Sequence, residues 1–219
     1  MTWLLFAWLA YFALHSALAS LAVKRWFAAF FPRQLPLYRL GFNMLAVLLL
    51  LPILWLTYRN PGPVLWRWQG IGFWLANGLA LAALGGFVYS LKSYDMQEFL
   101  GLRQWKFHVT RVEDQEHFQL SWYHRFVRHP WYFFGFVLVW TRDMSALTLL
   151  SSAMITLYFI VGSLLEEKKL LVYHGEIYRR YMERVPGLIP LPWKYLSEME
   201  RKELTRRVPG PGEVNARPR

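Results

Sequence analysis

Two basic side chains stand directly before a proline in the second half of the chain. Arg128 and His129 precede Pro130. Proline is favoured at the first position of a helix, because its missing N–H would have no partner there. A helix that begins at Pro130 presents the N–H groups of its first turn beside the two basic side chains, and this combination suits a carboxylate or a phosphate. The alternative interpretation, ordinary basic residues at a membrane edge, stays open at this point.

Two adjacent carboxylates, Glu166 and Glu167, stand where a later uncharged run, 145–165, comes to an end. Paired carboxylates can bind an ammonium group, ribose hydroxyls or a cation, and either can act as a base. The alternative is a solvated helix exit neutralised by Lys168 and Lys169. No metal site is expected, because no His or Asp lies at ligand spacing in this stretch. The chain has no cysteine, which excludes disulfides and thiolate chemistry.

Four further polar side chains are candidates for contact with small molecules. Tyr178 and Tyr181 lie three residues apart, on one face of a short helix. They could line an adenine or substrate pocket, or serve as interfacial tyrosines. His15 and Ser16 interrupt an apolar stretch, where polar groups usually face a helix partner or a cavity. We interpret this pair as candidates for lining a substrate tunnel.

Long apolar segments must position these residues. Runs of about twenty apolar residues cross ~30 Å of hydrocarbon, and four stretches without formal charge have this length: 3–23, 40–58, 71–91 and 145–165. A fifth, 130–141, is short and must tilt or be partly buried. The first run lacks the basic flank and cleavage site of a signal peptide. The sequence therefore predicts an all-α, polytopic membrane helix bundle of about five transmembrane helices with a cytoplasmic C-terminal helical segment.

The basic residues are distributed unevenly. The net charge is +11, and 22 of the 25 Lys and Arg residues fall in three segments, 24–39, 92–130 and 166–219. With five spans these segments share one face, so the positive-inside rule predicts an outside N-terminus and a cytoplasmic C-terminus in a bacterial-type inner membrane. Basic residues that meet anionic lipid explain the charge better than nucleic acid does, and no nucleic-acid partner is expected.

Four regions follow from this organisation. We expect an N-terminal three-span region, a cytoplasmic connecting segment, a C-terminal hairpin with the binding residues, and a basic, flexible tail; their ranges are 1–91, 92–128, 129–193 and 194–219. Small residues in the third span permit close helix approach in lipid, which would also allow a homodimer.

The second half of the chain resembles the isoprenylcysteine carboxyl methyltransferase-like superfamily of integral membrane methyltransferases. The pattern comprises RHPWYFFG (128–135), EEKKL (166–170), GEIYRRY (175–181) and VP (185–186). Upstream, His15-Ser16 and the phrase GLRQ (101–104) look like the bacterial methanethiol S-methyltransferase and NnrU-like branches. In one departure, Phe134 stands where the family commonly has glycine, and Gly135 follows one residue later. The bulkier ring could alter the cofactor pocket.

The resemblance implies S-adenosyl-L-methionine as cofactor, held by the last two spans and the C-terminal segment. Its carboxylate would suit Arg128, His129 and the helix start, and its amino group or ribose would suit Glu166 or Glu167. Adenosine would lie near the two tyrosines. The implied cofactor-binding residues are Arg128, His129, Pro130, Tyr132, Gly135, Glu166, Glu167, Tyr178 and Tyr181, with Arg128 and Glu167 as catalytic candidates.

Three functions are open on the sequence alone. The first is a membrane methyltransferase that acts on a small or lipophilic acceptor, such as a thiol or the carboxylate of a prenylated cysteine. In-line displacement at a sulfonium needs positioning and exclusion of water more than a strong acid or base. The second is a non-catalytic NnrU-like membrane protein that supports nitrogen-oxide or respiratory metabolism. The third is a small transporter.

Overall fold

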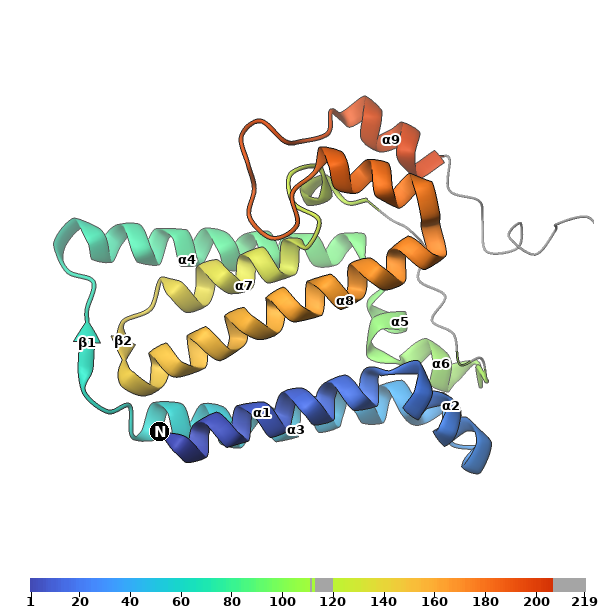
Figure 1. The fold of residues 1–219 in the computed structure, drawn as a ribbon, viewed down its shortest axis with the longest axis horizontal. Helices are drawn as coiled ribbons and strands as arrows, with labels where there is room; N and C mark the ends of the chain where they lie inside the picture. The colour runs from blue at the N-terminus through green and yellow to red at the C-terminus, as the bar shows by residue number, and fades with distance from the viewer. Residues whose placement is uncertain (111, 113–119, 207–219) are drawn as a thin grey trace, which may run out of the picture. The chain divides into compact units, whose positions relative to one another are not determined.

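Long apolar helices make up most of the protein in the computed structural model, which describes residues 1–110, 112 and 120–206 (Figure 1). Four of them are long and apolar enough to cross a membrane: α1 (Thr2–Ala19), α3 (Tyr38–Arg59), α4 (Gly70–Ser90) and α8 (Ala146–Arg184). The fifth predicted span is α7 (Pro130–Trp140), an apolar helix of 11 residues. The predicted all-α membrane helix bundle is therefore confirmed, with four long apolar helices and the shorter apolar helix α7 among the described residues.

The chain forms two compact units, and neither is continuous in sequence. Unit 1 comprises residues 1–72, 94–114 and 142–155, and unit 2 comprises residues 73–93, 115–141 and 156–219, within the described parts of the chain. Each is considered by itself below. The four regions predicted from the sequence stay a prediction.

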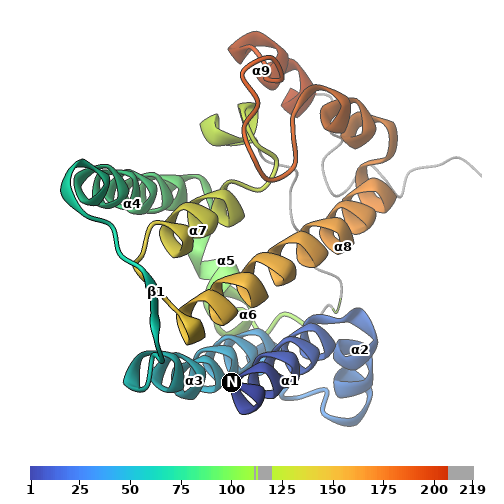
Figure 2. The same cartoon turned by 60° about the vertical axis from the view of Figure 1, so that its left-hand side comes forward.

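Unit 1 is built on the packing of α1 against α3, which lie side by side in Figures 1 and 2. Its core holds Leu4, Trp8, Ile53 and Met154. A buried indole needs a partner for its N–H, and Trp8 donates to the Ser151 hydroxyl at 3.0 Å. These contacts tie the first turns of α8 to the N-terminal helix pair.

Shorter elements complete unit 1: α2 (Leu21–Phe30), η1 (Leu35–Leu37), α5 (Met96–Leu100), α6 (Leu102–Lys106), and the strands β1 (Val64–Trp66) and β2 (Met144–Ser145), which pair antiparallel.

Gly101 joins α5 to α6 with a φ of 88°, a left-handed conformation that favours glycine. A Cβ there would lie 2.6 Å from the Leu40 backbone nitrogen. Glycine therefore permits both the turn and the approach to α3.

In unit 2, α4 lies beside α7, in line with the views of Figures 1 and 2. Trp131 donates its indole N–H to the Ser90 hydroxyl at 2.8 Å. Phe134 is buried, and a Cβ on Gly86 would lie 2.8 Å from two atoms of its ring. The ring of Tyr123 meets Phe134 edge-on at 5.1 Å between centroids. The bulk of Phe134 is thus accommodated by a glycine of α4.

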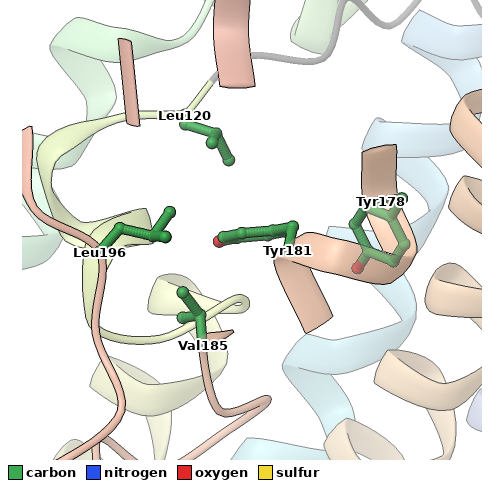
Figure 3. Packing of buried hydrophobic residues seen from close by; sticks show 5 residues of the cluster. All are labelled: Leu120, Tyr178, Tyr181, Val185 and Leu196. Atoms are coloured by element: carbon green, nitrogen blue, oxygen red, sulfur yellow. The ribbon is translucent and has the colours of Figure 1, made fainter. Parts of the chain in front are cut away.

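Helix α8 contains a bend at Gly175, where φ is 52° and ψ is −126°. The sequence predicted that Tyr178 and Tyr181 lie on one short helix, and both lie in the part of α8 that follows this bend. The second part packs into the hydrophobic core of unit 2, drawn in Figure 3. This core consists of Leu120, Tyr178, Tyr181, Val185 and Leu196.

The remaining elements of unit 2 are η2 (Leu91–Ser93), η3 (Trp122–Arg125) and α9 (Glu198–Arg206). Helix α9 lies within the segment predicted as a flexible tail. Arg201 donates to the Leu120 carbonyl at 2.6 Å, and an Arg184–Glu200 ion pair at 2.7 Å joins α9 to the end of α8. Part of that segment is therefore structured, and residues 207–219 lie outside the described residues.

Candidate functional site

The backbone before α7 is held against the segment that follows α8. The N–H of Arg128 donates to the Pro186 carbonyl at 2.8 Å, and the N–H of His129 donates to the Gly187 carbonyl at 3.0 Å. Backbone N–H groups away from water need such partners. These two bonds place the basic motif beside the Val-Pro motif, although more than fifty residues separate the two in sequence.

A buried ion pair joins the basic motif to α8. The guanidinium of Arg128 donates to Glu167 Oε1 through Nε at 2.8 Å and Nη2 at 2.7 Å. Its Nη1 donates to the carbonyls of Met182, at 3.1 Å, and Val185. The side chains of Arg128 and Glu167 are 11% and 9% exposed. Buried charges persist only when paired and hydrogen-bonded, and Arg128 meets this condition through four contacts.

His129 bridges the two carboxylates. Its Nε2 lies 3.0 Å from Glu167 Oε1, and its Nδ1 lies 3.3 Å from Glu166 Oε2, with the ring buried. Burial by itself lowers the pKa of a histidine. Here the hydrogen bonds and negative charges of Glu166 and Glu167 outweigh burial and raise the pKa of His129 above its usual 6.5. A protonated ring can donate to both carboxylates at once.

The two glutamates occupy different environments although they are adjacent. The side chain of Glu166 is 44% exposed, while that of Glu167 is almost completely buried. Successive helical residues point about 100° apart, so neighbours do not share a face. The Tyr132 hydroxyl lies beside Glu166, which also contacts His129. Of the pair, Glu166 is the carboxylate that a ligand can reach.

The two tyrosines lie in the core of unit 2. Tyr178 and Tyr181 are 2% and 1% exposed, and their rings meet edge-on at 5.8 Å between centroids. The Tyr181 hydroxyl donates to the His124 carbonyl at 2.7 Å, and Tyr178 is hydrogen-bonded to Arg128. In Figure 3 the ring of Tyr181 lies among Leu196, Val185 and Leu120. Their predicted contact with a cofactor stays a prediction.

The other predicted residues fall in both units. Pro130 is the first residue of α7, as expected from the helix-start rule. Gly135 faces α8, where a Cβ would lie 2.6 Å from the ring of Phe159. His15 lies in α1 of unit 1, and its ring is 5.0 Å from that of Phe42. Ser16 follows it in α1. A substrate tunnel at these two residues stays a prediction.

Sequence reasoning missed three further residues near the site. Gly187 accepts from His129, and a Cβ on it would lie 3.2 Å from the Arg128 guanidinium. Phe159 stacks on Tyr132. His124 accepts from the backbone N–H of Ser121 at its Nδ1. Gly187 adjoins the Val-Pro motif, and this was the one available signal.

Electrostatics separate the two histidines. Burial and the nearby charge of His129 lower the pKa of His124 to about 4. Because its Nδ1 is an acceptor, the neutral ring carries its hydrogen on Nε2. His124 therefore stays neutral near pH 7 while His129 is held towards its charged form. Among the described residues, no group of three or more His, Asp or Glu side chains is arranged to hold a metal ion.

Curated relatives of this chain share one kind of name. The chain is 31% identical over 191 residues to a methanethiol S-methyltransferase of a Pseudomonas strain, an alignment that covers 81% of this chain and 68% of the relative. It is 36% identical over 181 residues to methanethiol S-methyltransferase 2 of Bradyrhizobium diazoefficiens, covering 80% and 68%. It is 30% identical over 192 residues to the methanethiol S-methyltransferase of Mycobacterium tuberculosis, covering 83% and 74%. No family model and no solved structure matches the chain.

Apolar helices of membrane-spanning length, with a charged cluster where the uncharged part of α8 ends, define a multi-pass membrane protein with a polar site. The sequence identities to the relatives, and the share of each chain that is aligned, also identify the family. The chain belongs to the family of the methanethiol S-methyltransferases, within the isoprenylcysteine carboxyl methyltransferase-like branch, and it is a methyltransferase. The non-catalytic and transporter alternatives are set aside by this membership.

Proposed function

We propose that this protein transfers the methyl group of S-adenosylmethionine to a small thiol, with methanethiol as the acceptor. The relatives carry this proposal, because alignments over about four fifths of the chain lead to proteins named for that reaction. The charged cluster of unit 2 supports it, since it gathers the four charged residues that the family resemblance picked out.

The chemistry of the site fits the amino group of the proposed cofactor. An ammonium group is bound well by a carboxylate that is already fixed in place. Glu166 is such a carboxylate, because it is accessible and is held by His129 and Tyr132. Glu167 Oε1 already faces three donor nitrogens, two of Arg128 and one of His129. We therefore assign the cofactor's ammonium to Glu166.

The contacts among Arg128, Glu167 and His129 indicate the roles of these three residues. Arg128 and Glu167 neutralise each other and fix the segment that ends α8, so we assign them to holding the site rather than to touching substrate. His129 aligns both carboxylates. In this assignment the catalytic candidates of the sequence become positioning residues.

S-adenosylmethionine, when bound, would supply a methyl group on a positively charged sulfur. The thiolate sulfur would bond to the methyl carbon as the methyl–sulfonium bond breaks, and S-adenosylhomocysteine would leave with that bond's electron pair. A thiol has a pKa near 8.5, so a small fraction is ionised at neutral pH. The positive charge on the sulfur of the bound cofactor favours this thiolate form of the acceptor. The protein then has to bind the cofactor and the acceptor, orient them and exclude water from between them. The thiol proton leaves to solvent.

Binding of S-adenosylhomocysteine to the detergent-solubilised protein tests the cofactor assignment. Calorimetric titration of the wild type is expected to show one site, and Glu166→Gln is expected to weaken binding at least tenfold, because a neutral amide replaces the ammonium's counter-charge. Lys202→Ala is the matched control, since Lys202 lies on α9 and is exposed. Absence of binding by the wild type would refute the proposal.

The acceptor is tested separately, with radiolabelled methyl transfer. Methanethiol is expected to yield labelled dimethyl sulfide in the headspace. The competing acceptor is the carboxylate of a prenylated cysteine, which would give a non-volatile labelled ester. Label in the ester alone would keep the methyltransferase and reject the thiol.

The finer localisation is also a proposal. The distribution of Lys and Arg supports an outside N-terminus and a cytoplasmic C-terminus. In that orientation the charged cluster after the uncharged part of α8 meets the compartment that supplies a soluble cofactor.

A further inference from the structure

Three stacked rings lie beside the site, one at the N-cap of α7, one in α7 and one in α8. The rings of His129 and Tyr132 are 5.4 Å apart between centroids with planes 12° apart. The rings of Tyr132 and Phe159 are 4.7 Å apart with planes 8° apart. We call His129, Tyr132 and Phe159 the ring ladder. Tyr132 stacks on both of the other rings.

A glycine of α7 permits this packing. A Cβ on Gly135 would lie 2.6 Å from Phe159 Cε2, closer than real Cβ contacts allow. Gly162 of α8 lies next to Tyr132, since a Cβ on it would be in ordinary contact with the Tyr132 hydroxyl, at 3.5 Å. Positions three or four apart share a face of a helix, so Phe159, Gly162 and Glu166 form one face of α8. The ladder and the exposed glutamate therefore belong to one helix–helix contact.

The hydroxyl of Tyr132 connects the ladder to the carboxylate that we assign to the cofactor. It lies beside the Glu166 carboxylate. His129 contacts the same carboxylate, with its Nδ1 at 3.3 Å from Glu166 Oε2. Glu166 is 44% exposed, so it lacks the packing that fixes Glu167. We infer that its orientation depends on these two neighbours, and that the orientation of Tyr132 depends on the ring of Phe159.

We propose that Phe159 is a positioning residue for cofactor binding, which acts through Tyr132 on Glu166. The inference rests on the proposed function, since it names the residue that orients the ammonium-binding carboxylate of Glu166. Phe159 lies in an apolar stretch of α8, where a phenylalanine would otherwise only face neighbouring helices or lipid. Its flat contact with Tyr132, and the glycine kept clear for it, distinguish it from such a residue.

Replacement of the ring tests this role. Phe159→Leu is expected to raise the Kd for S-adenosylhomocysteine about three- to tenfold, the effect of losing one aromatic pair. The cofactor KM should rise in proportion while kcat at saturation changes less than about twofold, because Glu166 holds the ammonium and not the reacting methyl group. A merely structural role would lower the number of competent sites in the titration and leave Kd unchanged.

Controls separate Phe159 from general packing. Phe159→Tyr keeps the flat ring and should restore the wild-type Kd. Phe133→Leu removes a similar volume from α7, and its ring packs on Phe134 rather than on the ladder; its Kd should equal that of the wild type. In a Tyr132→Phe background, Phe159→Leu should have no further effect, because the link to Glu166 is already absent.

If Phe159→Leu fails to fold, Gly135→Ala displaces the same ring and should produce the same rise in Kd, absent again in the Tyr132→Phe background. Failure of the wild type to bind overturns both the proposed function and the ladder. A second outcome overturns only the role of the ladder: the wild type binds, and Phe159→Leu has an unchanged Kd. The same holds for an unchanged Kd in Gly135→Ala, if Gly135→Ala is the variant that folds. Additive effects of Phe159→Leu and Tyr132→Phe also overturn it, because Phe159 would then act by another route.

Discussion

At the scale of single residues, adjacent glutamates divide two tasks that the sequence could not separate. Glu167 is buried against Arg128 and His129, whereas Glu166 keeps nearly half of its side chain exposed. Removing one partner of a buried ion pair leaves an uncompensated charge, but an exposed pair contributes little. Stability should therefore depend on Glu167, and ligand binding on Glu166.

We expect Glu167→Gln to destabilise the protein by about 3–5 kcal/mol, because Arg128 loses its buried counter-charge. Glu166→Gln should cost less than about 1 kcal/mol. Thermal unfolding in detergent, followed by circular dichroism, measures both variants against the wild type. Equal losses of Tm in the two variants would contradict the division of tasks.

His129 makes stability depend on pH. Its folded-state pKa lies above the usual 6.5, so its contribution is fully present below about pH 6.5. It is lost as pH rises through the raised pKa. The Tm difference between the wild type and His129→Gln should therefore shrink as pH rises above about 6.5. His124 does not titrate in this window, because its pKa is about 4. A difference that grows with pH would be incompatible with a raised pKa.

At the scale of elements, the helices follow from the sequence more fully than their contacts do. Length and lack of charge identify the spans, Pro130 marks the start of α7, and Gly175 marks the bend in α8. The partners of these helices depend on shape. Phe159 could not be singled out, because a phenylalanine in an apolar run looks the same whether it meets lipid or Tyr132.

The contact of α4 with α7 provides a test of such shape dependence. Gly86→Ala would place a Cβ 2.8 Å from the buried ring of Phe134, and overpacking of this kind costs about 1–3 kcal/mol. Phe134→Leu should relieve the clash, so the double variant should recover part of the lost Tm. Gly85→Ala is the matched control, because nothing lies within 4 Å of a Cβ there. Equal effects at Gly85 and Gly86 would argue against this packing.

At the scale of the whole molecule, apolar surface and charge have separate places in the sequence. Large apolar side chains such as Trp3, Ile71 and Trp74 are at least 75% exposed on the long helices, as expected for surfaces that meet lipid. Basic residues concentrate in the segments between and after the spans. This separation is what allows orientation to be predicted from sequence, whereas the buried Arg128–Glu167 pair depends on tertiary contacts.

The predicted orientation can be measured with single cysteines, because the natural chain contains none. Asn60→Cys lies between the second and third spans and should react with a membrane-impermeant maleimide added to intact bacterial cells. Lys202→Cys lies on α9 and should react only after the cells are opened, because 22 of the 25 basic residues favour the cytoplasmic face. Retained methyl transfer in both variants controls for native insertion. The reverse labelling pattern would place the charged cluster outside the cytoplasm and separate it from a cytoplasmic supply of methyl donor.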